Sequence, residues 1–165
     1  MGELAREIEL LYCQNRQQLF TCALSITRSP ARAEDAVHEA FCGLLRLERR
    51  PDDLKAYAFR AVRNAALSEL RRRPTSDASM NEFIFDPSPS AAQSAEQNEF
   101  LREVSQALLE ISPDERETVV QHLYGELTFR EIATIRDVPM GTIVSWYRRG
   151  LEKLRTRLQV NDGAI

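Results

Sequence analysis

Apolar side chains recur at every third or fourth position through most of this chain, and almost no segment alternates as a strand does. Three such stretches precede residue 74. Their apolar positions are Leu4, Ile8, Leu11, Leu19 and Cys22, then Ala33, Val37, Ala40, Phe41, Leu44 and Leu45, then Leu54, Tyr57, Ala58, Ala61, Val62, Ala65 and Leu70. Ser29 followed by Pro30 is typical of a helix start, because serine caps the first turn and proline fits its first position. The pattern predicts three helices.

Four further helices are predicted in the last part of the chain. The apolar positions of the first are Phe100, Val104, Leu108 and Ile111. Ser112-Pro113 and Thr128-Phe129 each precede a Glu at the third helical position, which is typical of a capping box. The helix from Thr128 ends at Ile135, a short turn containing Asp137 and Pro139 follows, and the last helix continues to about residue 158. A short and a long helix joined in this way have the proportions of a helix-turn-helix.

Residues 74–95 interrupt the helical pattern with three Pro, five Ser and no Lys or Arg, which predicts a linker. Its Phe83-Ile84-Phe85 cluster is unusual for a spacer and could dock on a lobe or on a partner. The expected fold is all-α: two small helical domains, 1–73 and 96–165, joined by a flexible linker at 74–95, the C-terminal one a helix-turn-helix.

The net charge of −3 hides an uneven distribution. Residues 1–73 carry 13 basic and 10 acidic side chains, residues 74–110 one and seven, and residues 111–165 eight of each. The segment sums are +3, −6 and 0, so an acidic segment separates two neutral-to-basic lobes. Of the 22 cationic side chains, 20 are Arg. Arginine suits phosphates and base edges, although a genome rich in G·C codons would produce the same bias.

Several classes of protein are excluded. No apolar run reaches the roughly 18 residues of a membrane helix, and no secretory pattern opens the chain, so we expect a cytoplasmic protein without membrane insertion. Three cysteines without a Cys-x-x-Cys pair argue against a disulfide scaffold or zinc ribbon. His38 and Cys42 have the spacing of two metal ligands, but no third or fourth is in view. With no Gly-rich phosphate loop and no Ser/His/Asp set, we expect no enzyme, cofactor or metal.

Two helices are strongly basic. The last one carries Arg148, Arg149, Lys153, Arg155 and Arg157 against Glu152, with Thr142, Ser145 and Trp146 expected to be exposed nearby. This suits a helix in the major groove, and the alternative is an ordinary helical hairpin with a solvated basic face. Residues 46–73 carry nine basic and four acidic side chains, with Tyr57 and Phe59 as rings on which bases could stack. A single basic helix is more often a solvated face, but two in separate lobes favour nucleic-acid binding.

Four motifs follow one another in the chain: AEDAVHEAF (33–41), FRAVRNAALSELRRR (59–73), ISPDERETVV (111–120) and LTFREIATIRDVPMGTIVSWYRRGLEKLR (127–155). In this order and separation they strongly resemble the extracytoplasmic-function group of bacterial sigma-70-type sigma factors, from about Leu10 to Leu158. The resemblance implies a subunit that binds core RNA polymerase, at its clamp and flap regions, and directs promoter-specific transcription initiation. It also implies promoter DNA and an anti-sigma factor as partners.

The resemblance further assigns roles to single residues. The polar face of AEDAVHEAF would dock on the polymerase clamp; its residues are Glu34, Asp35, His38 and Glu39. The loop Arg46–Asp53 and the helix after it would hold and melt the −10 element, through Arg49, Arg50, Arg60, Arg63 and Asn64. The last helix would face the −35 element through Gly141, Val144, Ser145, Arg148 and Arg149.

The chain departs from the family pattern at four of these motif positions. The family usually has Gln at His38, Gly at Asp137, Ser at Pro139 and a basic residue at Val144. Asp tolerates a left-handed turn and Pro fits a first helical position, so we expect the helix-turn-helix to form. The change at Val144 makes the −35 sequence preference unpredictable.

Two other functions remain open. One is a stand-alone helix-turn-helix regulator, and the other is a sigma-like decoy that titrates an anti-sigma partner. An operator binder has no use for Arg46–Asp53 or Asn64, and a decoy should have lost its DNA-facing arginines. The alternative for Asn64 itself is a polar helix residue bonded locally.

Overall fold

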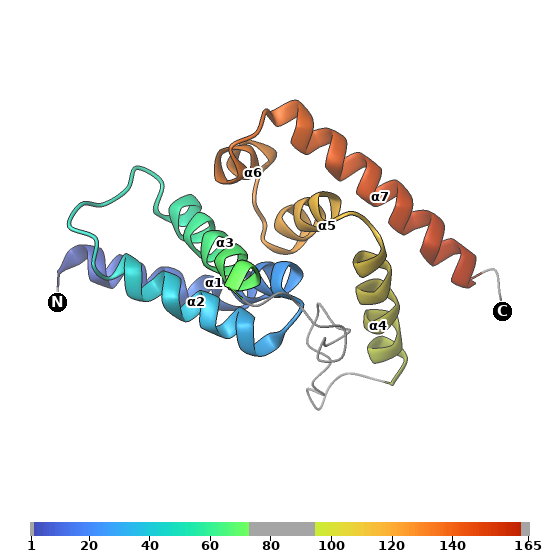
Figure 1. Ribbon diagram of the computed structural model, residues 1–165, viewed down its shortest axis with the longest axis horizontal. Helices are drawn as coiled ribbons and strands as arrows, with labels where there is room; N and C mark the ends of the chain where they lie inside the picture. The colour runs from blue at the N-terminus through green and yellow to red at the C-terminus, as the bar shows by residue number, and fades with distance from the viewer. Residues whose placement is uncertain (1, 73–94, 163–165) are drawn as a thin grey trace.

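The computed structural model describes residues 2–72 and 95–162, and every regular element in these two ranges is helical (Figure 1). The N-terminal lobe contains α1 (Glu3–Thr27), α2 (Pro30–Leu44) and α3 (Leu54–Arg72). The C-terminal lobe contains α4 (Ala95–Glu110), α5 (Pro113–Val119), the π-helical segment η2 (Val120–Tyr124), α6 (Phe129–Arg136) and α7 (Met140–Asp162). The all-α prediction is confirmed. Residues 74–94 of the predicted linker, with Phe83-Ile84-Phe85, lie outside the described residues, and Ala95 opens α4.

The N-terminal lobe is a three-helix bundle in which α1, α2 and α3 all contact one another. The predicted cap is present: the Ser29 hydroxyl accepts from the Arg32 backbone N–H, and Pro30 stands in the first turn of α2. Leu19, Leu24, Leu44 and Val62 are buried between the helices. None of the helices in the described ranges is long and apolar enough to cross a membrane.

Four aromatic or aliphatic positions differ from the predicted pattern of burial. Leu45 follows the end of α2 and is 58% exposed, and Tyr57 is 41% exposed. Phe59 is buried at 2% exposure, so it offers no ring to a base. In the C-terminal lobe Phe100, predicted to face inward, is 58% exposed.

The C-terminal lobe is organised around α5, which contacts both α4 and α7. Gly150 of α7 permits this close approach, since a Cβ added there would lie 2.9 Å from Val119 Cγ2. The Ser112 hydroxyl caps α5 by accepting from the Glu115 backbone N–H, while the Glu115 carboxylate binds Lys153 rather than closing a capping box. An ion pair between α5 and α7 therefore replaces one half of the predicted box.

The two lobes pack against each other. Helix α1 contacts α5 and η2, and α3 contacts α6 (Figure 1). The π-helical turn of η2 was not predicted; it ends where the Gly125 backbone N–H donates to Val120 O at 2.9 Å. The wider turn lies on the side of the C-terminal lobe that meets α1.

Candidate nucleic-acid interface

The predicted DNA-facing residues of the C-terminal lobe share one open face of α7. Gly141, Ser145, Arg148 and Arg149 are exposed and Val144 is half-buried. No atom lies within 4 Å of a Cβ built on Gly141, so the helix start is unobstructed. Residues three, four, seven and eight positions apart lie on the same side of a helix, and here that side turns away from the core. Two guanidinium groups are thus free to approach phosphates or base edges.

The rest of the helix-turn-helix fixes the orientation of this face. The predicted capping box opens α6: the Thr128 hydroxyl accepts from the Glu131 N–H, and the Glu131 carboxylate accepts from the Thr128 N–H. Asp137 takes the left-handed conformation, with φ 54°, that the resemblance assigns to a glycine. Ile132 and Ile143 are fully buried between the helices. The motif forms with aspartate in the turn, as expected.

Arg136 has a structural role that the sequence analysis missed. Its side chain is only 2% exposed, and its Nη atoms donate to Asp114 Oδ1 at 2.6 Å and Thr118 Oγ1 at 2.7 Å. Nη2 also lies 3.2 Å from Glu117 Oε2, and the guanidinium carbon is 4.6 Å from the centre of the Trp146 ring. We call these five residues the Arg136 cluster.

The Arg136 cluster joins α5, α6 and α7 through one side chain. Burial lowers the pKa of the Arg136 guanidinium, while the neighbouring Glu117 and Asp114 carboxylates oppose that shift. Trp146, expected to be exposed, is half-buried. The sequence held one signal for this cluster: Arg136 stands four residues after Ile132 and next to Ile135, on the inward side of α6.

In the N-terminal lobe, the predicted −10 residues of α3 have different surroundings. Arg60 and Asn64 are exposed, whereas the Arg63 side chain is 19% exposed and its Nε donates to Glu117 of the other lobe. Arg60, Arg63 and Asn64 share a helix face, as predicted, but the Arg63 guanidinium is already paired with the Glu117 carboxylate.

The predicted loop forms between α2 and α3, and its two predicted DNA-facing residues, Arg49 and Arg50, are exposed. Arg50 donates to Glu7 Oε2 at 2.7 Å and to Pro51 O at 3.0 Å, and the hydrogen bond to Glu7 raises the Arg50 pKa. No such partner is found for Arg49 among the interactions of the described residues. The loop thus has one arginine tied to α1 and one pointing into solvent.

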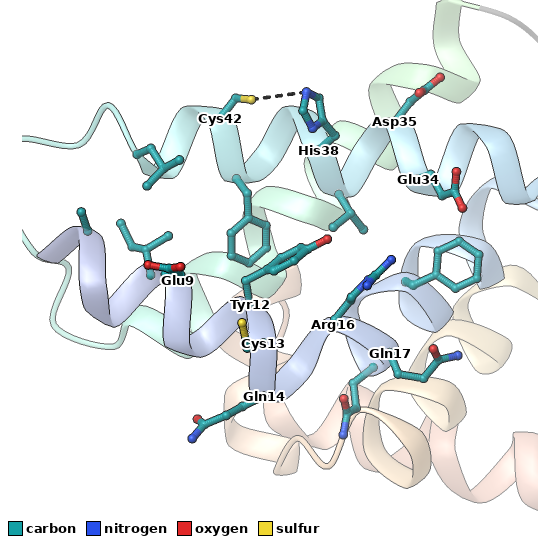
Figure 2. A pocket seen from close by; sticks show the side chains of 17 residues that line it. Glu9, Tyr12, Cys13, Gln14, Arg16, Gln17, Glu34, Asp35, His38 and Cys42 are labelled. Atoms are coloured by element: carbon teal, nitrogen blue, oxygen red, sulfur yellow. Dashed lines mark hydrogen bonds between the residues drawn. The ribbon is translucent and has the colours of Figure 1, made fainter. Parts of the chain in front are cut away.

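Three of the four predicted docking residues line a groove of about 1100 Å³ between α1 and α2 (Figure 2). Glu34, Asp35 and His38 contribute from α2; Tyr12 and Arg16 contribute from α1. The Tyr12 ring packs edge-on against Phe41 at 5.0 Å, so that two of the residues lining the groove join α1 to α2. Glu39 does not line the groove; it lies 3.5 Å from Arg72 at the end of α3.

His38 and Cys42 approach each other as their spacing suggests, with 3.6 Å between Nε2 and Sγ (Figure 2). No third ligand joins them: within residues 2–72 and 95–162, no group of three or more His, Cys, Asp or Glu side chains is placed to hold a metal ion. The pair forms part of the polar rim of the groove.

Comparison with known proteins identifies both lobes. Residues 11–74 match the family described as Sigma-70 region 2, and residues 101–154 match Sigma-70, region 4. The chain belongs to the sigma-70 family. The two regions contain the predicted polymerase and −10 residues of α2 and α3, all of α6, and α7 as far as residue 154, which includes its predicted −35 residues. Their order is typical of the extracytoplasmic-function group.

Two individual proteins resemble this sigma-70 chain along most of its length. RNA polymerase sigma factor CarQ of Myxococcus xanthus is 29% identical over 136 residues, which cover 81% of this chain and 78% of CarQ. The structure of sigma factor RpoE in complex with anti-sigma factor NepR, from Bartonella quintana, superposes with a TM-score of 0.73 at 23% identity, over 94% of this chain and 96% of that one. Members of the family are transcription initiation factors that act with core RNA polymerase and promoter DNA, not enzymes.

Proposed function

We propose that this chain works as a sigma factor of the extracytoplasmic-function group: it binds core RNA polymerase and selects promoters with two separate DNA-facing surfaces. The observation that carries this proposal is the match to regions 2 and 4 in one chain, each region presenting an exposed basic helix face. Polymerase supplies the catalysis, and the proposed role puts the protein in the cytoplasm beside it.

The α1–α2 groove is proposed to dock on the polymerase clamp. The Glu34 and Asp35 carboxylates are exposed at its edge and suit a basic partner surface. His38 adds a hydrogen-bonding group in place of the usual amide. The pairing of Glu39 with Arg72 makes Glu39 a weaker candidate than the other three.

The −10 element is proposed to bind across the loop and α3. Extruded bases need a pocket with nearby cations and a side chain that can both donate and accept. Arg49 and Arg60 are exposed cations beside this surface, and Asn64 offers the paired donor and acceptor. With Phe59 buried, stacking falls to the exposed Tyr57 ring.

The −35 element is proposed to bind the open face of α7, with Arg148 and Arg149 as the main contacts. Val144 lies on the same face, between these arginines and the start of α7. The family usually has a basic residue at this position, so the preferred −35 sequence should differ from that of other members. An anti-sigma factor is a further proposed partner, supported by the complex in which the RpoE relative was solved. The polymerase flap is the proposed partner of the C-terminal lobe.

A run-off transcription assay with core polymerase and a random-promoter library tests the proposal. The wild-type chain should select templates that share an upstream and a downstream element, and Arg149→Ala should lose selection at the upstream one. Arg6→Ala on α1, also an exposed arginine, is the matched control and should behave as wild type.

Two results would contradict the proposal. Sequence-specific duplex binding in the nanomolar range without polymerase, at about 150 mM salt, would favour a stand-alone regulator. Binding to polymerase without any selected transcript would favour a decoy.

A further inference from the structure

Arg63 is the side chain at which the proposed promoter surface and the C-terminal lobe meet. Its Nε donates to Glu117 Oε1, across 54 residues of sequence. The Glu117 side chain is 8% exposed and that of Arg63 is 19% exposed, so the pair is largely shielded from water. Arg63 shares its helix face with Arg60 and Asn64, which are open to solvent.

Further contacts hold the lobes together around this pair. The Arg116 Nε donates to Ser25 O near the end of α1 at 3.1 Å, and Arg116 is itself buried. Cys22 of α1 is buried beside the same contact: a Cβ on Gly125 would lie 3.3 Å from its Sγ. Burial, together with the nearby Glu117 carboxylate, raises the pKa of the Cys22 thiol.

A carboxylate and a nucleic-acid phosphate are both anions that accept from a guanidinium, and Arg63 cannot serve both from one shielded position. Separation of the lobes would release Arg63 without leaving Glu117 unpaired, because Arg136 of its own lobe lies 3.2 Å from Glu117 Oε2. Buried charges that keep a partner avoid most of the penalty of opening.

We propose that the packed arrangement is a self-inhibited state, in which Glu117 occupies the site of promoter DNA on Arg63. Promoter melting then requires the lobes to separate. This inference rests on the proposed function for its consequence in transcription, but the closed state itself is a property of the free chain.

Cys22 provides a direct measurement of opening. In a Cys13→Ser/Cys42→Ser background Cys22 is the one remaining thiol, and its rate of maleimide labelling reports how often the contact opens. Glu117→Gln should raise this rate about ten- to hundredfold, the range expected for loss of one charged hydrogen bond. Glu115→Gln is the matched control, because Glu115 is buried on the same helix but pairs with Lys153 within its own lobe. It should leave the rate unchanged.

Glu117 also belongs to the Arg136 cluster, so Glu117→Gln could raise the labelling rate by destabilising the C-terminal lobe. A second variant separates opening of the lobes from such local unfolding. Arg63→Gln breaks the same contact from the other lobe and leaves Glu117 with Arg136. It should raise the labelling rate to a similar extent, with urea unfolding followed by Trp146 fluorescence unchanged. Two results would refute the proposed closed state. One is that Arg63→Gln labels at the same rate as the Cys13→Ser/Cys42→Ser background, and the other is that Cys22 in that background labels as fast as in urea.

The link to DNA is tested with a random-sequence single-stranded 20-mer as probe. In Cys13→Ser/Cys42→Ser the oligonucleotide should speed labelling of Cys22, and Glu117→Gln should bind it several-fold more tightly in fluorescence anisotropy. Unchanged affinity in a variant that labels faster would overturn the competition for Arg63. These measurements need no polymerase, so a failure of the proposed function would appear separately, as absent run-off transcription with normal labelling.

Discussion

The Arg136 cluster allows a quantitative prediction about how the helix-turn-helix is held. Arg136→Met keeps the apolar stem of the side chain and removes the guanidinium that bonds Asp114, Thr118 and Glu117. Breaking a buried ion pair from one side costs about 3–5 kcal/mol. Here Asp114 is 57% exposed and can be solvated, and Glu117 retains Arg63. We therefore expect the lower end, about 3 kcal/mol.

The assay follows from the position of the single tryptophan of the chain. Trp146 stacks on Arg136, so its fluorescence during urea unfolding reports the C-terminal lobe. For a lobe of this size, about 3 kcal/mol corresponds to a melting temperature lower by about 12–24 °C. Arg157→Met is the control: it removes a pair with Glu110 in which both side chains are nearly half exposed, and should cost less than about 1 kcal/mol. Equal destabilisation by the two variants would refute the assignment of a structural role to Arg136.

Three further predictions test the surfaces and the packing. Asp35→Arg should abolish capture by core polymerase while the melting temperature stays near that of wild type; normal capture with a lowered melting temperature would make Asp35 only a helix-terminus residue. Arg149→Ala should cost roughly 1–3 kcal/mol at the upstream promoter element and spare pre-melted templates, whereas Asn64→Ala should fail at the downstream element, as measured by run-off transcription; an identical loss on all templates would indicate misfolding. Gly150→Ala should destabilise the C-terminal lobe by about 1–3 kcal/mol, less the gain in helix propensity, because its Cβ would press on α5, and Gly141→Ala should stabilise it by up to about 1 kcal/mol in thermal melts; the reverse order would contradict the packing described.

The parts of the fold that depend on neighbouring residues could be predicted from the sequence. The cap at Ser29-Pro30 and the box at Thr128–Glu131 use contacts three residues apart, so their patterns are visible in the chain itself. The open face of α7 follows for the same reason, since its five residues repeat with the period of the helix.

The residues that were predicted wrongly or missed depend on which helix meets which. Tyr57 and Phe59 stand two positions apart on α3, and packing against α1 and α2 buries Phe59 and leaves Tyr57 exposed. The pairing of Arg63 with Glu117 joins residues of different lobes, and no local pattern encodes it. To predict that Arg136 is buried, one would have to know that α5 presents two carboxylates to the end of α6.

The hydrogen bond from Arg116 to Ser25 has a consequence for the order of folding. It spans 91 residues, and its acceptor belongs to the last turn of α1, where helix carbonyls have no partner of their own. During synthesis the whole of α1–α3 leaves the ribosome before Arg116 does, so the Ser25 carbonyl is first hydrated and is bonded only later. Non-local contacts of this kind form slowly because a long loop must close first. A nascent chain should therefore pass through a stage in which the N-terminal lobe is folded and its surface for the C-terminal lobe is still open to other molecules.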